Sequence, residues 1–496
     1  MGMRGWKKYS WGLVSGVLLL VLVVLGTGLA GCSVLDTELG RAVSEAVGLD
    51  PYSLDEGGRR ELGRFEAVYR NYGRADAGSL EHFTEAFKRV RADYVRLVDD
   101  AQLIDAAIKG LRDRQPAPGS LPPGELVETA LDAMLVSLDP HSFYLNPDEL
   151  RHTMVSTSGK FGGLGIEITD DKGAIKVVSP IEGTPAYRAG IKPGDIITHL
   201  DGSAIKGLTL MQSVMRMRGR PGTDIRLTIE RDDHPPFDVT ITRAIIKIVA
   251  VRWRTEGNIG YLRVATFSKA TRDGAAKAMR DIRRSLGERM KGLVVDLRDN
   301  PGGLLDESVA LADAFVERGT LVSVRGRSVA AGHEYRASAG DLAKGLPMVV
   351  LINGGSASAS EIVAVALQDL KRATIMGGRS FGKGTVQTIM RLPREGGLKM
   401  TTALYYSPLG RAIQARGVVP DIAIDVGEEI KNPRREADLP GALPGATTAP
   451  DATQARLDAA DCPAAGDNDD RQLGCALVLL QAGSMSSFLA SLGKTL

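Results

Sequence analysis

An alternation of short apolar runs with amphipathic stretches, from about residue 246 to residue 430, constrains the fold of this chain more than any other feature. Strands and helices that alternate in this way are typical of βαβ units, in which helices connect the parallel strands of one sheet. We therefore expect an α/β core in this part of the chain. The expected strands cover 292–297, 348–352 and 373–376, and the expected helices cover 304–316 and 361–370.

The rest of the sequence divides into segments that, together with this core, predict a multidomain α+β protein. A length of 496 residues agrees with two to four domains. We expect a signal segment at 1–31, a helical region at 32–150, a β-rich domain at 151–245, the α/β core at 246–430, and a linker rich in proline and alanine with a closing helix at 431–496.

Apolar residues at spacings of three and four predict two helices in the helical region. A proline- and glycine-rich breaker at 115–124 separates them. Asp139-Pro140 ends the second helix, because a residue before proline disfavours the helical conformation. The apolar face of the first helix consists of Phe83, Phe87, Val90, Tyr94 and Leu97, and that of the second consists of Val127, Leu131, Met134 and Leu138.

The composition excludes several classes of function. The chain has 62 basic and 60 acidic residues, and this balance gives no general electrostatic field for binding nucleic acid. Its three cysteines form no C-x-x-C pair and it contains no H-E-x-x-H motif, so neither common type of zinc site is expected. We therefore expect no metal ion, and no nucleotide or other cofactor is expected either.

The N-terminus has the pattern of an export signal. Basic residues precede an uncharged run from Ser10 to Gly31, which ends in Leu-Ala-Gly-Cys at 29–32. This ending resembles the cleavage box of bacterial lipoproteins, and the resemblance implies cleavage before Cys32, lipidation of this cysteine and a membrane anchor. An uncleaved spanning helix is the alternative, since about 20 apolar residues cross a bilayer. Either way we expect the chain in the cell envelope, facing the periplasm, and by the same resemblance Ser33 favours the outer membrane.

Export permits a disulfide between the other two cysteines, because disulfides persist in oxidising compartments. Cys462 and Cys475 are 13 residues apart and form an even pair once Cys32 is lipidated. The spacing alone leaves two free thiols as an equal alternative, since a bridge requires a geometry that no sequence shows.

Two glycine-rich motifs stand out in the β-rich domain. The first is Gly163-Leu164-Gly165-Ile166, ahead of an expected strand, and the second is the run GTPAYRAGIKPGDIITHLDG at 183–202. Together they resemble the PDZ domains of exported proteases. The resemblance implies binding of protein or peptide substrates with apolar C-termini, whose carboxylate the backbone N–H groups of the first motif would hold while the strand edge pairs with the tail. A PDZ fold that serves only as a spacer or an internal lid is the alternative.

Three motifs of the expected core contain residues suited to nucleophilic catalysis. A serine at a strand-to-helix turn is exposed, and the N–H groups of the helix N-terminus can hold an oxyanion. Only one of the six histidines, His333, lies in the core, so a Ser-His-Asp triad is not expected. A lysine removed from water can act as the base instead. Lys383 suits this role, and Gln387 lies on the same face of a helix or strand.

The motifs D-L-R-x-N-x-G-G (296–303), S-A-S-A-S-E-I (356–362) and F-G-K-G-T-V-Q (381–387), in this order, resemble those of the C-terminal processing (tail-specific) serine proteases, peptidase family S41. The segment L-D-P-H-S-F-Y at 138–144 and the PDZ-like domain extend the resemblance over nearly the whole mature chain. It implies a ClpP/crotonase-like core and a serine endopeptidase acting on envelope proteins. In that family's terms, Ser358 is the nucleophile, Lys383 the general base, Gln387 its neighbour, and the N–H groups of Ala359 and Gly302, with Gly303 as an alternative, form the oxyanion hole.

Other interpretations remain open at this point. Ser358 and Glu361 also fit a helix capping box, and each of the other motif residues in isolation fits an ordinary loop or turn. A non-catalytic PDZ scaffold, an envelope lipoprotein that binds an apolar ligand and a purely structural lipoprotein are the alternative functions. The family resemblance allows a helical-repeat lipoprotein adaptor and a homo-oligomer as partners, and no nucleic-acid partner is expected.

Overall fold

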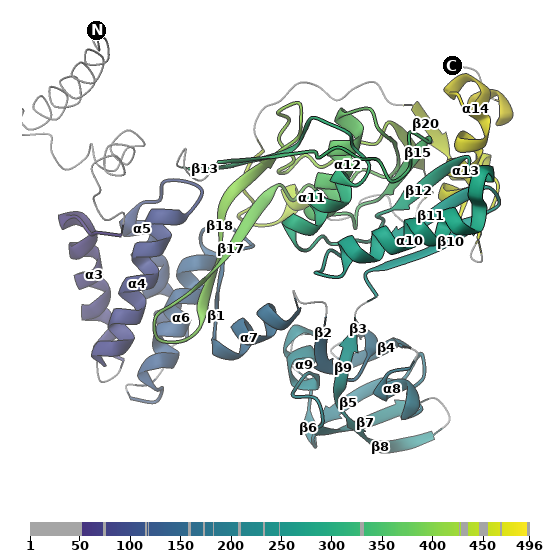
Figure 1. Ribbon diagram of the computed structural model, residues 1–496. Helices are drawn as coiled ribbons and strands as arrows, with labels where there is room; N and C mark the ends of the chain where they lie inside the picture. The colour runs from purple at the N-terminus through teal and green to yellow at the C-terminus, as the bar shows by residue number, and fades with distance from the viewer. Residues whose placement is uncertain are drawn as a thin grey trace, which may run out of the picture. The chain divides into compact units, whose positions relative to one another are not determined.

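A computed structural model gives the fold (Figure 1). It describes residues 52–72, 76–114, 117, 119–156, 160–171, 174–181, 183–206, 210–231, 234–247, 249–327, 332–425, 427, 435–445, 455–466 and 469–493. The expected signal segment and Cys32 lie outside these residues. No helix in the described part of the chain is both long and apolar enough to cross a membrane.

The chain forms two compact units. The first contains Met1–Tyr144, Val324–His333 and Thr385–Leu404, and the second contains Leu145–Ser323, Glu334–Gly384 and Tyr405–Leu496. The helices of the first unit are α3 (Glu56–Tyr69), α4 (Ala77–Asp93), α5 (Asp100–Arg114) and α6 (Pro123–Val136).

The apolar faces expected in the helical region form the core of the first unit. Phe83, Phe87 and Val90 of α4 are fully buried. Leu97, expected on the same face, is 51% exposed, because α4 ends at Asp93 and Tyr94 has an extended backbone. The helix α5 ends directly before the expected breaker, and α6 begins within its last two residues, at Pro123, because proline suits a first helical position.

An antiparallel hairpin completes the first unit. Its strands are β17 (Thr385–Arg391) and β18 (Gly397–Tyr406). The full sheet has the order β1-β18-β13-β14, with β17 paired to β18; its other strands are β1 (Phe143–Leu145), β13 (Thr320–Gly326) and β14 (His333–Arg336).

The part of the chain expected to be β-rich, 151–245, lies in the second unit and contains a sheet of antiparallel strands. Its sheet has the order β3-β4-β5-β7-β8, so β3 is an edge strand, and the short β6 pairs with β5. The strands are β3 (Ile166–Asp171), β4 (Ala174–Pro180), β5 (Ile196–Leu200), β6 (Ser203–Ala204), β7 (Asp224–Arg231) and β8 (His234–Thr242). A two-stranded ribbon of β2 (Lys160–Gly163) and β9 (Ala244–Lys247), and the helices α7 (Pro147–Ser156), α8 (Pro185–Arg188) and α9 (Leu210–Met217), accompany it.

The expected α/β core is a seven-stranded sheet of order β10-β11-β12-β15-β16-β19-β20. Only the hairpin of β10 and β11 is antiparallel, and the other neighbours pair in parallel, as strand–helix alternation predicts. The strands are β10 (Val251–Glu256), β11 (Ile259–Val264), β12 (Gly292–Asp296), β15 (Met348–Ile352), β16 (Thr374–Gly377), β19 (Ile422–Asp425) and β20 (Ala455–Asp458), and the helices are α10 (Thr271–Leu286), α11 (Leu305–Asp313) and α12 (Ala359–Asp369).

The chain closes with residues 455–493, which we call the C-terminal element. It contains β20, the edge strand of the core sheet, and two helices, α13 (Arg471–Ala482) and α14 (Met485–Ser491), whose apolar side chains pack on one face of that sheet. The single closing helix expected from the sequence is wrong, because Gly483 ends α13 with φ of 74° and Ser484 caps a new helix. The linker is also shorter than the sequence predicts. Two parts of the expected linker are ordered against the core, because β20 pairs with β19 of the core sheet and Glu436 is fully buried.

Of the two alternatives for the late cysteines, a disulfide and two free thiols, the structure has the disulfide. Cys462 and Cys475 are bonded, with their Cα atoms 5.1 Å apart, and both side chains are buried. The disulfide connects Cys462, in the segment before α13, to Cys475, in the second turn of that helix.

Candidate active site

The predicted nucleophile lies at the sharp turn between β15 and α12. Ser358 is the residue before the first residue of α12 and has φ of 56° and ψ of −112°. A positive φ in a residue other than glycine costs about 1–3 kcal/mol and is concentrated at functional sites. The turn therefore holds Ser358 in a strained conformation at a helix N-terminus, where N–H groups are free to stabilise negative charge.

The three serines of the S-A-S-A-S motif have different environments. Ser356 is fully buried, and its hydroxyl donates to the Leu297 carbonyl at 2.8 Å. Ser360 is also fully buried, and its hydroxyl donates to the Asn300 carbonyl at 2.8 Å. Within the described part of the chain the Ser358 hydroxyl makes no such bond to a carbonyl, and the residue is half-buried. The hydroxyl groups of Ser356 and Ser360 thus connect structural elements, and in the described part of the chain that of Ser358 has no such carbonyl partner.

A single buried carboxylate connects the serine turn with the lysine loop. Glu361 Oε2 accepts hydrogen bonds from the backbone N–H groups of Ser358 at 2.7 Å and Lys383 at 2.9 Å. Its other oxygen, Oε1, accepts from Ser380 Oγ at 2.5 Å and from the Gly382 N–H at 2.7 Å. The capping-box position expected for Glu361 is therefore real, and this side chain also fixes the loop that contains Lys383.

Glu361 is fully buried, and burial raises the pKa of its carboxyl group to about 7. The hydrogen bonds from Ser380, Ser358, Gly382 and Lys383 act in the opposite direction, because they stabilise the ionised form. The group therefore titrates near neutral pH at the centre of the candidate site.

The loop after β12 lies against the same turn. A Cβ atom on Gly302 would lie 2.8 Å from the Ala357 carbonyl oxygen and 3.0 Å from both Ala359 N and Ser358 Cβ. Gly302 also has φ of 100°, so glycine is required there for both reasons. This close approach explains the glycine in the D-L-R-x-N-x-G-G motif.

The structure distinguishes between the two glycines as oxyanion donors. The N–H of Gly302 donates to Asn300 Oδ1 at 2.9 Å, so the donor expected from the sequence is engaged within its own loop. The N–H groups of Gly303 and Ala359 donate to no acceptor among the described residues. Of the two glycines, this conformation therefore leaves Gly303, the alternative, with an available N–H.

Asn300 connects this loop to both sides of the nucleophile. Its carbonyl accepts from the Ala357 N–H at 3.0 Å as well as from Ser360 Oγ. Its side-chain amide donates to the Val264 carbonyl at 2.9 Å, which anchors the loop to β11. Neither this role of Asn300 nor the contact of Glu361 with the loop that contains Lys383 was expected from the sequence. Their places inside the D-L-R-x-N-x-G-G and S-A-S-A-S-E motifs were the available signal.

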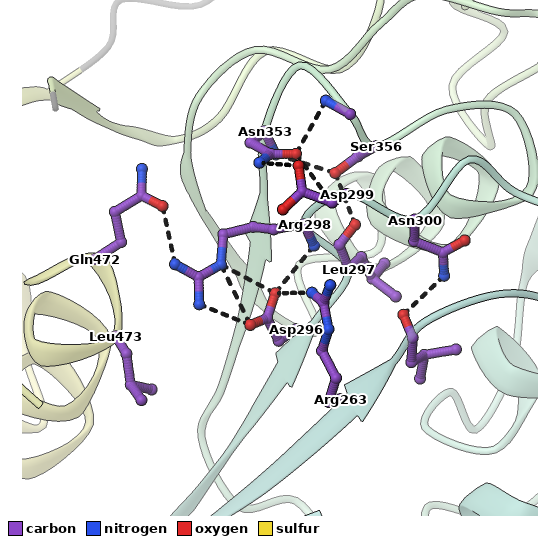
Figure 2. Close-up of polar contacts among 12 residues, drawn as sticks. Arg263, Asp296, Leu297, Arg298, Asp299, Asn300, Asn353, Ser356, Gln472 and Leu473 are labelled. Carbon is purple, nitrogen blue, oxygen red and sulfur yellow. Dashed lines mark hydrogen bonds and ion pairs between the residues drawn. The ribbon is translucent and has the colours of Figure 1, made fainter. Parts of the chain in front are cut away.

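A buried cluster of charges supports the start of this loop (Figure 2). Asp296, only 1% exposed, accepts hydrogen bonds from Tyr261 Oη at 2.7 Å, from Arg263 at 2.9 Å and from Arg298 at 2.7 Å. Burial alone would raise the pKa of Asp296, but the hydrogen bonds and charge of Arg298, with those of Arg263, hold it below its usual value. Burial and the neighbouring Asp296 also raise the pKa of Tyr261 to about 12.

Gln387 belongs to the first unit, on β17, whereas Ser358, Ala359, Gly302 and Lys383 belong to the second. Its side-chain amide donates to Thr385 Oγ1 at 2.8 Å and Thr401 Oγ1 at 3.3 Å. Its expected role beside the Lys383 amine stays a prediction.

The L-D-P-H-S-F-Y segment supports the strand opposite Gln387. Thr401 Oγ1 donates to Asp139 Oδ1 at 3.1 Å, and the Thr401 N–H donates to Ser142 Oγ at 3.1 Å. Asp139 and Ser142 are each 1% exposed and are hydrogen-bonded to one another at 2.7 Å. The motif therefore contributes a buried polar network that holds β18.

The four predicted peptide-binding residues run from the end of β2 to the first residue of the edge strand β3. The carbonyl groups of Leu164 and Gly165 accept hydrogen bonds from the N–H groups of Ala186 and Ile181, both at 2.9 Å. Their own N–H groups have no acceptor among the described residues. Gly163 ends β2 and Ile166 begins β3. The arrangement offers two backbone donors next to an open strand edge.

No group of three or more His, Cys, Asp and Glu side chains in the described part of the chain is arranged to hold a metal ion.

Comparisons with known proteins identify relatives of this chain. The sequence profile of Peptidase family S41 matches residues 258–424, and that of the PDZ domain matches residues 162–240. A carboxy-terminal-processing protease of Bartonella bacilliformis is 48% identical over 348 residues, which are 70% of this chain and 75% of the relative. The Bacillus subtilis carboxy-terminal processing protease CtpA is 31% identical over 370 residues, or 72% of each chain.

Among solved structures, the photosystem II D1 C-terminal processing protease matches with 30% sequence identity and a TM-score of 0.48, covering 70% of this chain and 93% of that one. The Bartonella bacilliformis relative is similar enough, and is covered over enough of its length, to establish which family this chain belongs to. The chain belongs to the carboxy-terminal-processing proteases of peptidase family S41, and it is a serine-type peptidase with a PDZ domain.

Proposed function

We propose that this protease uses Ser358 as its nucleophile and Lys383 as its general base. The observation that supports this dyad is that one Glu361 oxygen accepts hydrogen bonds from the backbone N–H groups of both residues. This shared acceptor holds the two backbone segments next to each other. The strained backbone of Ser358 and its position at the N-terminus of α12 support the choice of this serine over Ser356 and Ser360.

In the proposed reaction, the neutral Lys383 amine takes the proton of the Ser358 hydroxyl, whose oxygen attacks a peptide carbonyl carbon. The negative charge that develops on the carbonyl oxygen is held by the N–H groups of Ala359 and Gly303. Lys383 then gives its proton to the departing amine, and water hydrolyses the acyl-enzyme. Gly302 contributes by allowing the loop after β12 to approach Ser358. Gln387 contributes a side-chain amide that would steady the Lys383 amine.

We further propose that the PDZ domain binds the apolar C-terminal tails of substrates. The unused N–H groups of Leu164 and Gly165 suit a terminal carboxylate, and the open edge of β3 suits an extended peptide. A peptide with a free C-terminal carboxylate is then expected to bind at least about tenfold more tightly than its C-terminally amidated form.

The site of action is proposed to be the cell envelope, with Cys32 lipidated and substrates drawn from envelope proteins. The disulfide between Cys462 and Cys475 supports an oxidising compartment, because cytosolic thiols are kept reduced. Incorporation of a labelled fatty acid into the wild-type chain, and its absence from Cys32→Ser, is the expected result.

The dyad is tested with purified protein and casein as the substrate. Ser358→Ala and Lys383→Ala are each expected to lower the rate of cleavage at least about 1,000-fold. Ser338→Ala and Lys277→Ala, which change an exposed serine and an exposed lysine, are the matched controls and should cleave as the wild type does. Full casein cleavage by both dyad variants would exclude the assignment.

A further inference from the structure

The guanidinium group of Arg298, in the D-L-R motif, lies between two carboxylates, those of Asp296 and Asp470. Figure 2 shows its contacts with Asp296 and Gln472. On one side Arg298 Nη2 is 2.7 Å from Asp296 Oδ2. On the other side, Arg298 Nη2 is 2.6 Å from Asp470 Oδ2 and Nη1 is 3.0 Å from Asp470 Oδ1, a two-pronged contact. Gln472 Oε1 accepts a further bond from Nη1 at 3.0 Å. The Arg298 side chain is 13% exposed, so these contacts are largely shielded from water.

Asp470 comes from the C-terminal element, outside the residues 258–424 that match the peptidase family. Three interactions fix the position of Asp470. Its side chain caps α13 by accepting from the Leu473 N–H at 3.0 Å, and its own N–H donates to the Ala465 carbonyl at 2.9 Å. It also lies within the loop that the disulfide closes between Cys462 and Cys475.

The element that carries Asp470 is firmly attached to the core sheet. Leu473, Cys475 and Ala476 of α13 are fully buried, in one apolar cluster with Val294 of β12 and Val349 of β15. Asp470 is therefore a fixed anchor for a basic side chain, since the helix, the disulfide and the sheet all hold it in place.

Arg298 in turn belongs to the loop that faces the nucleophile. The loop runs from Arg298 to Gly303, and Asn300 within it receives hydrogen bonds from Ala357 and Ser360, the residues on both sides of the Ser358–Ala359 pair. A displacement of Arg298 would therefore reach Asn300 and Gly303 through the backbone of the loop, and the Ser358 turn through the hydrogen bonds of Asn300 with Ala357 and Ser360.

We propose that Asp470 is a positioning residue of this protease: the disulfide-closed C-terminal element holds Arg298 and, through it, the loop that supplies an oxyanion donor to Ser358. The inference rests on the proposed function, because it requires Ser358 to be the nucleophile. It assigns a part in catalysis to a segment that the family profile does not include.

The proposal predicts a specific kinetic signature. Loss of the Asp470 charge leaves Arg298 with Asp296 as its remaining carboxylate, and charge-assisted hydrogen bonds are the strong ones. The loop then samples positions in which its donor misses the oxyanion. Because the oxyanion forms only after substrate is bound, kcat should fall about tenfold or more while KM stays within about twofold.

Asp470→Asn is the decisive variant, because asparagine caps helices as well as aspartate does but has no charge. The matched control is Asp458→Asn, which changes another capping aspartate of the same element, one that accepts from the Ala460 N–H and is exposed. We expect a tenfold or greater loss of kcat on a chromogenic peptide for Asp470→Asn, none for Asp458→Asn, and partial recovery for Asp470→Glu, which restores the charge. An equal kcat loss in Asp458→Asn, or a wild-type kcat in Asp470→Asn, would overturn the inference.

Reduction of the wild-type enzyme tests the same link without a substitution and covers the case in which Asp470→Asn does not fold. Dithiothreitol supplies two electrons and two protons to the Cys462–Cys475 bond, giving two thiols and its own cyclic disulfide. We expect kcat to fall, with KM within about twofold, once thiol titration shows both cysteines free, and the Cys462→Ser/Cys475→Ser variant to be low from the start and insensitive to the reagent. Full kcat in the reduced enzyme would contradict the proposal. A wild type without Ser358-dependent cleavage would instead overturn the proposed function, and the inference with it.

Discussion

The backbone N–H groups of Ser358 and Lys383 donate to one and the same oxygen, Oε2 of Glu361. The two residues are separated along the chain by the whole of α12 and β16, yet one buried side chain fixes both. Because the contact is made through the backbone, it sets where each side chain begins without occupying the hydroxyl or the amine. Glu361 therefore positions the backbone of both members of the proposed dyad.

We predict that Glu361→Gln retains the fold and lowers kcat/KM at least about tenfold. Glutamine has one acceptor oxygen where the carboxylate has two, so its NH2 group would face either the Ser358 and Lys383 N–H groups or the Ser380 and Gly382 donors. A buried donor left without an acceptor costs about 1–3 kcal/mol. The activity assay on casein measures this loss.

Glu288→Gln is the matched control for that variant, because Glu288 is exposed and lies in the short helix after α10, away from the serine turn. It should retain wild-type activity. Wild-type kcat/KM in Glu361→Gln would show that the shared oxygen has no part in catalysis.

We predict that the stability of the wild type relative to Glu361→Gln falls as pH rises from about 4.5 to about 7. Burial raises the pKa of Glu361 to about 7 in the folded protein, from 4.5 for an ordinary glutamate. Between these values the unfolded chain has released this proton and the folded chain keeps it, so the free energy of unfolding decreases with pH. Over this pH range the free energy of unfolding is expected to decrease by about 3 kcal/mol. Urea titrations at several pH values measure it, and a difference independent of pH would contradict the prediction.

We predict that Gly302→Ala folds but loses at least about tenfold in kcat. A Cβ atom at this position would lie within 3.0 Å of Ser358 Cβ and Ala359 N, and it would displace the loop from the serine turn. Gly345→Ala is a matched control, because Gly345 also has positive φ, 75°, but a Cβ there would meet nothing within 4 Å. Comparable kcat losses in both variants would mean that backbone strain, and not the close approach, is responsible.

Much of the fold could be predicted from the sequence, because buried parallel strands and amphipathic helices have clear local patterns. The strand at 348–352 agrees with β15 at both ends, and the helix at 304–316 agrees with α11 to within three residues. The strand β10 was missed because it is an edge strand whose middle residues are exposed, so its sequence has no continuous apolar run. The break between α13 and α14 was missed because a single Gly483 decides it.

The candidate site was predictable only in part, for a related reason. Motifs identify which residues occupy the turn and the loops, and Ser358, Ala359, Gly302 and the Lys383 backbone do come together. The contacts of Glu361 with Lys383, and of Arg298 with Asp470, join segments 22 and 172 residues apart. Such contacts depend on tertiary packing, which local patterns do not specify.

The most direct test of the account is the identity of the acylated residue. The enzyme is mixed with a p-nitrophenyl ester, quenched with acid during the initial burst of p-nitrophenol, digested and mapped by mass spectrometry. We predict that the acyl group is on Ser358 and that Lys383→Ala, which lacks the base, carries none. Acylation of Ser356 or Ser360 in place of Ser358, or equal acylation of Ser358 in Lys383→Ala, would contradict the Ser358–Lys383 dyad.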